Sequence, residues 1–227
     1  MKTFSPNFHK AAHDYLYLLN RNYPQSTLIK LVGDRYQLSG VERSMLYRGI
    51  SSSVDAAKRR SKLINNLSSG SEPLSIDACN VLITLGSYLN GNIVFISNDD
   101  FLRDASEIHG KVFRTSLIER SLDLVFKYLQ HHGIKNVRFY IDSPISFSGK
   151  LCERINHTLS ELDMKGFAQT HISPDHILKN LNEGILATSD SVIIDKTLLP
   201  VIDLPKNILE FHFHPGFVDL GTLFTEV

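Results

Sequence analysis

The chain has 227 residues, of which 42% are hydrophobic and 21% charged, as in a globular protein with a substantial core. Its 24 basic and 24 acidic side chains cancel, but residues 1–70 hold 11 Lys/Arg and 4 Asp/Glu, which leaves 13 and 20 in residues 71–227. The sequence has no run of about 20 apolar residues, no signal-peptide pattern and only two cysteines, so we expect a cytoplasmic protein without a membrane partner.

Residues 1–70 are predicted to form a small helical domain. Apolar residues at helical spacing indicate helices over 6–20 and 27–32, and Gly33 is expected to end the second of them. Ser39 is suited to cap a third helix that continues to Gly49.

The spacing of the second and third helices around a short turn matches a helix-turn-helix, although three-helix packing produces the same spacing. The positive charge of this domain fits a surface that faces nucleic acid, and it also fits a solvated helix face. The candidate phosphate contacts are Arg43, Arg48, Arg59 and Arg60.

Residues 66–75 have the composition of a linker, so we place a domain boundary near Gly70. In residues 71–227, short apolar strands alternate with helices, which predicts an α/β fold with a mostly parallel sheet sandwiched by helices. The expected strands cover residues 74–76, 137–141, 168–172, 185–188 and 199–204.

Several of these strands end in aspartate. Asp77, Asp142 and Asp190 each follow a strand directly or within two residues, and Asp203 lies near the end of the last strand. The carboxyl ends of parallel strands meet at one edge of a sheet, where carboxylates can bind Mg²⁺ or Mn²⁺ and promote phosphodiester hydrolysis. Aspartate also caps helices, and Asp203 is set aside because Leu204-Pro205 leads from it into a helix.

The acidic strand ends carry a resemblance to nucleases. Asp77-Ala78-Cys79-Asn80 looks like the Asp-x-x-Asn opening of the PIN and NYN folds, and Thr188-Ser189-Asp190 is similar to their Thr-x-Asp element. The whole chain resembles an uncharacterised prokaryotic family with a small N-terminal helical domain and a PIN-like C-terminal domain. Further motifs that carry this resemblance are Gly33-Asp34-Arg35-Tyr36, Leu102-Arg103-Asp104, His109-Gly110 and Asp142-Ser143-Pro144.

The resemblance implies a site with residues in different roles. Asp77, Asp142 and Asp190 would be catalytic ligands of Mg²⁺ or Mn²⁺, with Asp104 as a further catalytic carboxylate. Supporting residues would be Asn80, Thr188, Ser189 and Asp195, and contacts to nucleic acid would come from Arg103 and Lys150.

We therefore expect a metal-dependent nuclease, an endoribonuclease that prefers RNA to DNA. One alternative is a PIN-like module that binds nucleic acid or protein without catalysis. Another is a small-molecule phosphohydrolase or nucleotide-binding enzyme on the same sheet, because a fold does not fix a function. The sequence leaves open whether the chain forms a homo-oligomer.

Overall fold

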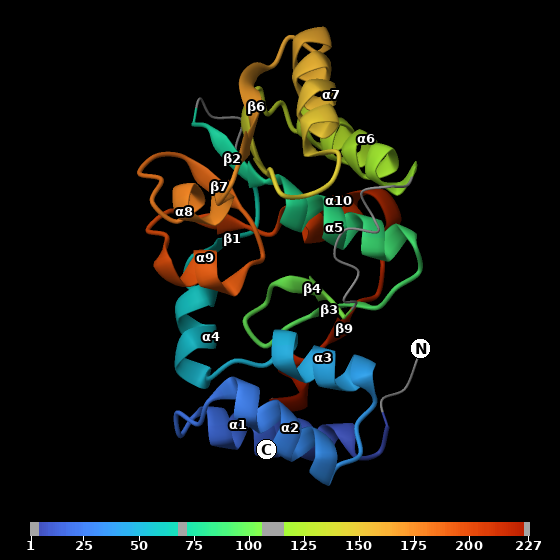
Figure 1. The fold of residues 1–227 in the computed structure, drawn as a ribbon, viewed down its shortest axis with the longest axis vertical. Helices are drawn as coiled ribbons and strands as arrows, with labels where there is room; N and C mark the ends of the chain where they lie inside the picture. Colours follow the sequence, from blue (N-terminus) through green and yellow to red (C-terminus); the bar gives the residue numbers. More distant parts are fainter. Residues whose placement is uncertain (1–4, 68–71, 106–115, 225–227) are drawn as a thin grey trace. The chain divides into compact units, whose positions relative to one another are not determined.

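The computed structural model describes residues 5–67, 72–105 and 116–224 (Figure 1). The expected boundary at Gly70 and the motif His109-Gly110 lie outside these residues. The chain divides into two compact units, which we call the helical unit and the sheet unit. The helical unit comprises residues 1–61, 91–107 and 216–227, and the sheet unit comprises residues 62–90 and 108–215.

This division differs from the expected one, because two segments that follow the expected boundary, residues 91–107 and 216–227, belong with the N-terminal helices. The helices are α1 (Phe8–Leu19), α2 (Gln25–Arg35), α3 (Gly40–Gly49) and α4 (Ser53–Arg60). The added elements are β3 (Val94–Ile96), β4 (Leu102–Asp104), β9 (Val218–Asp219) and the 3₁₀ helix η2 (Gly221–Phe224). Within the described residues, these three strands form a small sheet in the order β4-β3-β9.

Apolar packing explains why the later segments join the helical unit. Phe95 of β3 and Leu220, which follows β9, are fully buried in one core with side chains of α1, α2 and α3. A Cβ on Gly49 would lie 2.5 Å from Leu220 Cδ1 and 2.5 Å from Phe95 Cε2. The missing side chain of Gly49 therefore lets the small sheet pack closely on the end of α3.

The predicted helices of this unit are confirmed, but the role of Gly33 is different. Ser39 and Glu42 form a capping box at the start of α3, with Glu42 N–H donating to Ser39 Oγ at 3.3 Å. Gly33 lies inside α2, which continues to Arg35, and does not end the helix. A Cβ at Gly33 would lie 2.4 Å from Nη1 of Arg43, so the glycine makes room for this guanidinium.

The sheet unit has the alternating order of strands and helices that the sequence predicts. Its strands are β1 (Leu63–Ile64), β2 (Leu74–Asp77), β5 (Asn136–Asp142), β6 (Lys165–His171), β7 (Ile185–Ala187) and β8 (Val201–Ile202). Its helices are α5 (Ala78–Leu89), α6 (Ser116–His131), α7 (Ser148–Glu161), α8 (Pro174–Leu178), α9 (Ser191–Lys196) and α10 (Leu204–Phe213).

All strand pairs of this sheet are parallel among the described residues, in the order β1-β8-β7-β2-β5-β6. Successive residues of β5 show that helices cover both faces. The Phe139 ring lies 5.8 Å from the Phe126 ring of α6, whereas Tyr140 packs with Leu178 of α8 and Ile193 of α9. Because neighbouring strand residues point to opposite faces, the sheet is the middle layer of three.

None of the helices in the described part of the chain has the length and apolar character needed to cross a bilayer.

Candidate functional site

The strand order contains a switch point between β2 and β7. From β2 the chain proceeds outward through β5 and β6, then returns to β7 and continues outward through β8 on the other side. In open α/β sheets, ligands bind at such a point, beyond the carboxyl ends of the two central strands. Asp77 is the last residue of β2, and residues 188–190 directly follow β7.

Asp77 is a buried carboxylate at this point. Its side chain is only 6% exposed. Thr188 Oγ1 donates to Asp77 Oδ2 at 2.9 Å, and the backbone N–H of Asn80 donates to Oδ1 at 3.2 Å. Burial, together with the smaller effect of the Asp190 and Asp142 carboxylates, raises the pKa of Asp77 to about 7 against these two hydrogen bonds. The charged form is therefore costly in this protein.

Side chains predicted to support the site bridge β2 and β7. Asn80 Oδ1 accepts hydrogen bonds from the backbone N–H of Ser189 at 2.9 Å and from Ser189 Oγ at 3.1 Å. The Thr188 hydroxyl, which donates to Asp77, also accepts from the Asp190 N–H at 3.1 Å. Together these contacts fix the turn after β7 against the beginning of α5.

A further carboxylate, which the sequence analysis missed, belongs to this neighbourhood. Asp175 lies in the first turn of α8, after β6. Its pKa is raised by partial burial and by the charges of Asp190 and Asp142. The sequence indicates this residue only weakly, because Asp175 follows Pro174 at the start of a helix and does not directly follow a strand. Asp77, Asp142, Asp175 and Asp190 thus form an acidic group at one edge of the sheet, which we call the acidic edge.

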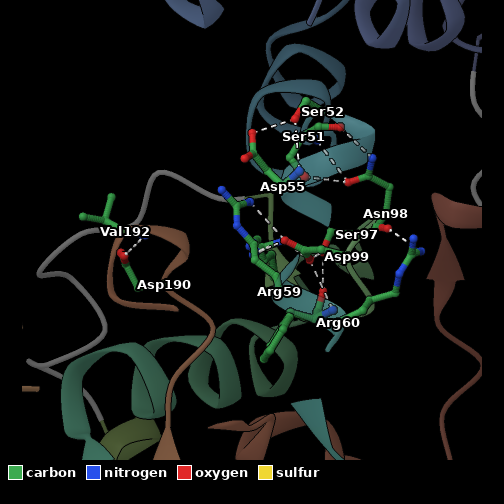
Figure 2. A network of polar contacts seen from close by, with 12 residues as sticks. Ser51, Ser52, Asp55, Arg59, Arg60, Ser97, Asn98, Asp99, Asp190 and Val192 are labelled. Carbon is green, nitrogen blue, oxygen red and sulfur yellow. Dashed lines mark hydrogen bonds and ion pairs between the residues drawn. The ribbon is translucent and has the colours of Figure 1, made fainter. Parts of the chain in front are cut away.

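Helix capping accounts for part of the strand-end pattern. Asp77, Asp190 and Asp203 are the N-caps of α5, α9 and α10. Asp190 Oδ1 accepts from the N–H groups of Val192 and Ile193 at 2.7 and 3.2 Å, and the contact to Val192 is drawn in Figure 2. Capping does not require the burial of Asp77 beside other carboxylates, so it does not explain the acidic edge fully.

The donor set fits a hard cation in its chemistry. Carboxylate oxygens are preferred ligands of Mg²⁺ and Mn²⁺, and the Asp77 oxygens keep lone pairs beyond their two hydrogen bonds. Among the residues that the structure describes, however, no group of three or more His, Cys, Asp or Glu side chains is arranged to hold a metal ion. The residue types therefore suit such an ion, while their present spacing does not form a finished site.

Two other predicted residues, Asp104 and Arg103, belong to the helical unit and not to the unit that holds Asp77. Asp104 is 2% exposed and pairs with Arg48 at 3.1 Å. Arg103 forms a two-pronged ion pair with Asp99, at 2.7 and 2.9 Å. Both predicted residues thus have ionic partners inside the helical unit.

The arginines that were expected to contact phosphate also have partners in this unit. Figure 2 shows Arg59 donating to Asp99, at 3.1 Å, and Arg60 donating to the backbone carbonyl of Asn98, also at 3.1 Å. Burial acts to raise the pKa of Asp99, but the guanidinium groups of Arg103 and Arg59 lower it to about 2. These contacts join α4 to the β3–β4 segment.

Arg43 pairs with Asp34 at 2.8 Å and donates to the Leu38 carbonyl at 3.0 Å.

The charge asymmetry between the two halves of the sequence is not found between the two structural units. Residues 1–61 carry ten basic and four acidic side chains, and the other segments of the helical unit add one basic and six acidic ones. The net charge is therefore about +1 for the helical unit and −1 for the sheet unit.

The remaining predicted residues lie in the sheet unit. Lys150 is exposed in the first turn of α7, with Nζ 5.7 Å from the Phe147 ring centre. Asp195 is exposed on α9, and its carbonyl accepts from Lys62 Nζ at 3.4 Å. Asp203 borders a separate cavity of about 350 Å³ beside β1 and β8, which Tyr128 and Lys206 also line.

The fold and the acidic edge define a doubly wound α/β unit joined to a helical unit of three chain segments. Residues 64–207 match a family described as a domain of unknown function (DUF5616), and residues 7–62 match one described as a protein of unknown function (DUF434). The chain belongs to this two-domain family.

The uncharacterized protein MJ0935 of Methanocaldococcus jannaschii is 30% identical over 203 residues, which cover 89% of this chain and 96% of that protein. No solved structure matches the chain.

Proposed function

We propose that the sheet unit is a PIN-like nuclease domain that hydrolyses phosphodiester bonds with Mg²⁺ or Mn²⁺ at the acidic edge. The observation that carries this proposal is Asp77, a buried carboxylate at the switch point whose pKa is raised by burial and by two neighbouring carboxylates. Such an arrangement is unfavourable in the free protein and becomes favourable once a cation neutralises it.

Each side chain of the acidic edge would have its own role toward a bound cation. Asp77, Asp142 and Asp190 would hold the ion, while Thr188 orients Asp77 through its hydrogen bond at 2.9 Å. Asn80 and Ser189 would keep the two strand ends in register. A bound Mg²⁺ or Mn²⁺ supplies an acidified water and neutralises charge on the phosphate.

The proposed preference for RNA over DNA comes from the resemblance to PIN and NYN nucleases. The arginines of the helical unit add less support than their number suggests, because Arg43, Arg48 and Arg59 are paired with aspartates.

The test uses the full chain with Mn²⁺ and a pool of labelled single-stranded RNA, single-stranded DNA and duplex RNA. We expect cleavage of RNA by the wild-type protein and a loss of about 100-fold or more for Asp77→Asn, because outer partners of metal ligands already cost about 10- to 100-fold. Asp203→Asn is the matched control, since Asp203 is another buried strand-end cap. Cleavage that survives in Asp77→Asn and in excess chelator would overturn the proposal.

A second function, binding of nucleic acid without catalysis, is favoured by one observation. Three strand-end aspartates already serve as helix caps, and the described residues contain no ready-made metal group. This alternative predicts salt-sensitive binding of nucleic acid together with no heat of Mn²⁺ binding at millimolar metal in a calorimetric titration.

A further inference from the structure

Exposed apolar side chains follow three of the strands of the sheet that carries the acidic edge. Phe147, Ile172 and Val192 are 54%, 87% and 55% exposed, and they lie shortly after β5, β6 and β7 respectively. In the sheet, β5 and β7 are the neighbours of β2, and β6 is the neighbour of β5. The three side chains therefore follow the same edge of the sheet as Asp77. The edge therefore offers apolar surface beside its carboxylates.

Phe147 is unusual among these side chains because its backbone is strained. It adopts φ +69° and ψ +12°, the left-handed region that favours glycine and asparagine and that a bulky residue rarely occupies. The residue is the N-cap of α7, yet its side chain makes no capping hydrogen bond. An asparagine here would adopt this backbone conformation more easily.

Core packing does not explain Phe147 either, because more than half of its side chain is exposed. The loop that carries it is nevertheless well held. Ser148 N–H donates to the Ile145 carbonyl at 3.1 Å, and Ser148 Oγ donates to the Ser143 carbonyl at 3.1 Å. The backbone at Phe147 is thus held five residues after Asp142, while the ring contributes little to the core. Strain that the fold does not require points to a function of the side chain.

A cation stands beside this ring, since Lys150 Nζ lies 5.7 Å from the ring centre. An exposed aromatic face next to a basic side chain is the combination that binds an unpaired base and its phosphate. Bases in a duplex are already stacked on one another, and therefore their faces are not available to such a ring.

We propose that Phe147 is a base-stacking residue and that the ligand of the acidic edge is a single-stranded nucleic acid. This inference rests on the proposed function, because it uses the acidic edge as the place where the phosphodiester backbone would lie. Phe147 would be a positioning residue that holds one base while Lys150 contacts a phosphate.

The experiment measures fluorescence anisotropy of a labelled twelve-nucleotide uridine RNA at low salt, once in EDTA and once with Ca²⁺ in place of Mn²⁺, because the carboxylates of the acidic edge repel phosphates when no cation is bound. A gel of the same samples checks that the RNA stays intact. We expect Phe147→Asn to bind about 5- to 100-fold more weakly than wild type, from the usual contribution of one stacked base. Phe147→Tyr should keep the affinity, because tyrosine also stacks. Lys150→Ala should make the RNA affinity less dependent on salt concentration, by the amount expected for the loss of about one phosphate contact.

Stability gives an independent readout. We expect the melting temperature of Phe147→Asn to rise by about 2–4 °C, because the strained backbone is relieved while binding is lost. A purely structural role would give the opposite result, a lower melting temperature. The matched control is Tyr23→Asn, which removes another exposed aromatic ring and should leave RNA affinity unchanged.

The outcomes separate this inference from the proposed function. Equal affinity of wild type and Phe147→Asn, failure of the wild type to bind the single strand, or equally tight binding of duplex RNA would overturn it. Stacking-dependent binding without any cleavage in Mn²⁺ would support Phe147 and contradict the nuclease. Cleavage with the same KM in wild type and Phe147→Asn would support the nuclease and contradict Phe147.

Discussion

Replacement of Asp77 by asparagine tests the physical basis of the acidic edge without any substrate. The variant keeps an oxygen that can accept from the Asn80 N–H, and asparagine is an equally good helix cap. It removes the charge that burial and the neighbouring carboxylates disfavour, and it replaces the oxygen that accepts from Thr188 by an NH₂ group, which can donate to the Thr188 hydroxyl instead. We therefore expect Asp77→Asn to be more stable than the wild type at neutral and alkaline pH.

The magnitude follows from the pKa. The carboxyl has a pKa of 3.8 when exposed and about 7 in the folded protein. Because the folded pKa is the higher one, the folded state binds the proton more tightly, and stability falls as the pH rises from about 4 to about 7. At roughly 1.4 kcal/mol per pKa unit, the full effect is on the order of 4 kcal/mol, of which about 3 kcal/mol falls between pH 5 and pH 8.

Urea unfolding of both proteins at about pH 5 and about pH 8 measures this difference, as the free energy of unfolding extrapolated to water. The wild type should lose about 3 kcal/mol more than Asp77→Asn between the two pH values. Asp123→Asn, which removes an exposed carboxylate, is the control and should behave like the wild type. Parallel pH profiles for wild type and Asp77→Asn would refute the reasoning.

The remaining predictions concern packing and ion pairs, each measured by urea unfolding. Asp99→Asn should lose about 3–5 kcal/mol, because Arg103 remains buried without its carboxylate, whereas Asp100→Asn, at the looser 4.0 Å pair with Arg60, should lose less than about 1 kcal/mol. A loss at Asp99 no larger than at Asp100 would contradict this assignment. Gly166→Ala should lose about 3 kcal/mol or more, since its Cβ would lie 1.7 Å from the Val137 carbonyl oxygen at φ +133°. Gly149→Ala, with nothing within 4 Å, should gain roughly 0.5–1 kcal/mol, and equal effects of the two changes would be inconsistent with the structure.

Local elements of the fold were predictable because their signals are local. The helices expected over 6–20 and 27–32 and the cap at Ser39 depend on the types and spacing of neighbouring residues, and the structure confirms them. The grouping of β3, β4 and β9 with the helices was not predictable, since it depends on contacts between residues such as Gly49 and Leu220.

The candidate site shows the same limit. The motif around Asp77 and the motif around Asp190 were visible separately. The sequence does not show that β7 lies beside β2, because Thr188 comes 111 positions after Asp77. Asp175 was missed because it lies in the first turn of α8 and does not directly follow a strand. The arginines were visible as charges, but the sequence does not show that Arg59 pairs with Asp99, 40 residues later.

The three-segment construction of the helical unit has a consequence for biosynthesis. Its helices leave the ribosome before the sheet unit, yet their core includes Phe95 and Leu220. Before residues 218–224 are made, the surface around Gly49 that Leu220 covers is open to water. The helical unit, whose helices are translated first, is therefore completed only after the sheet unit has been synthesised. In a protein shortened before β9, the N-terminal helices should not pack into a stable core.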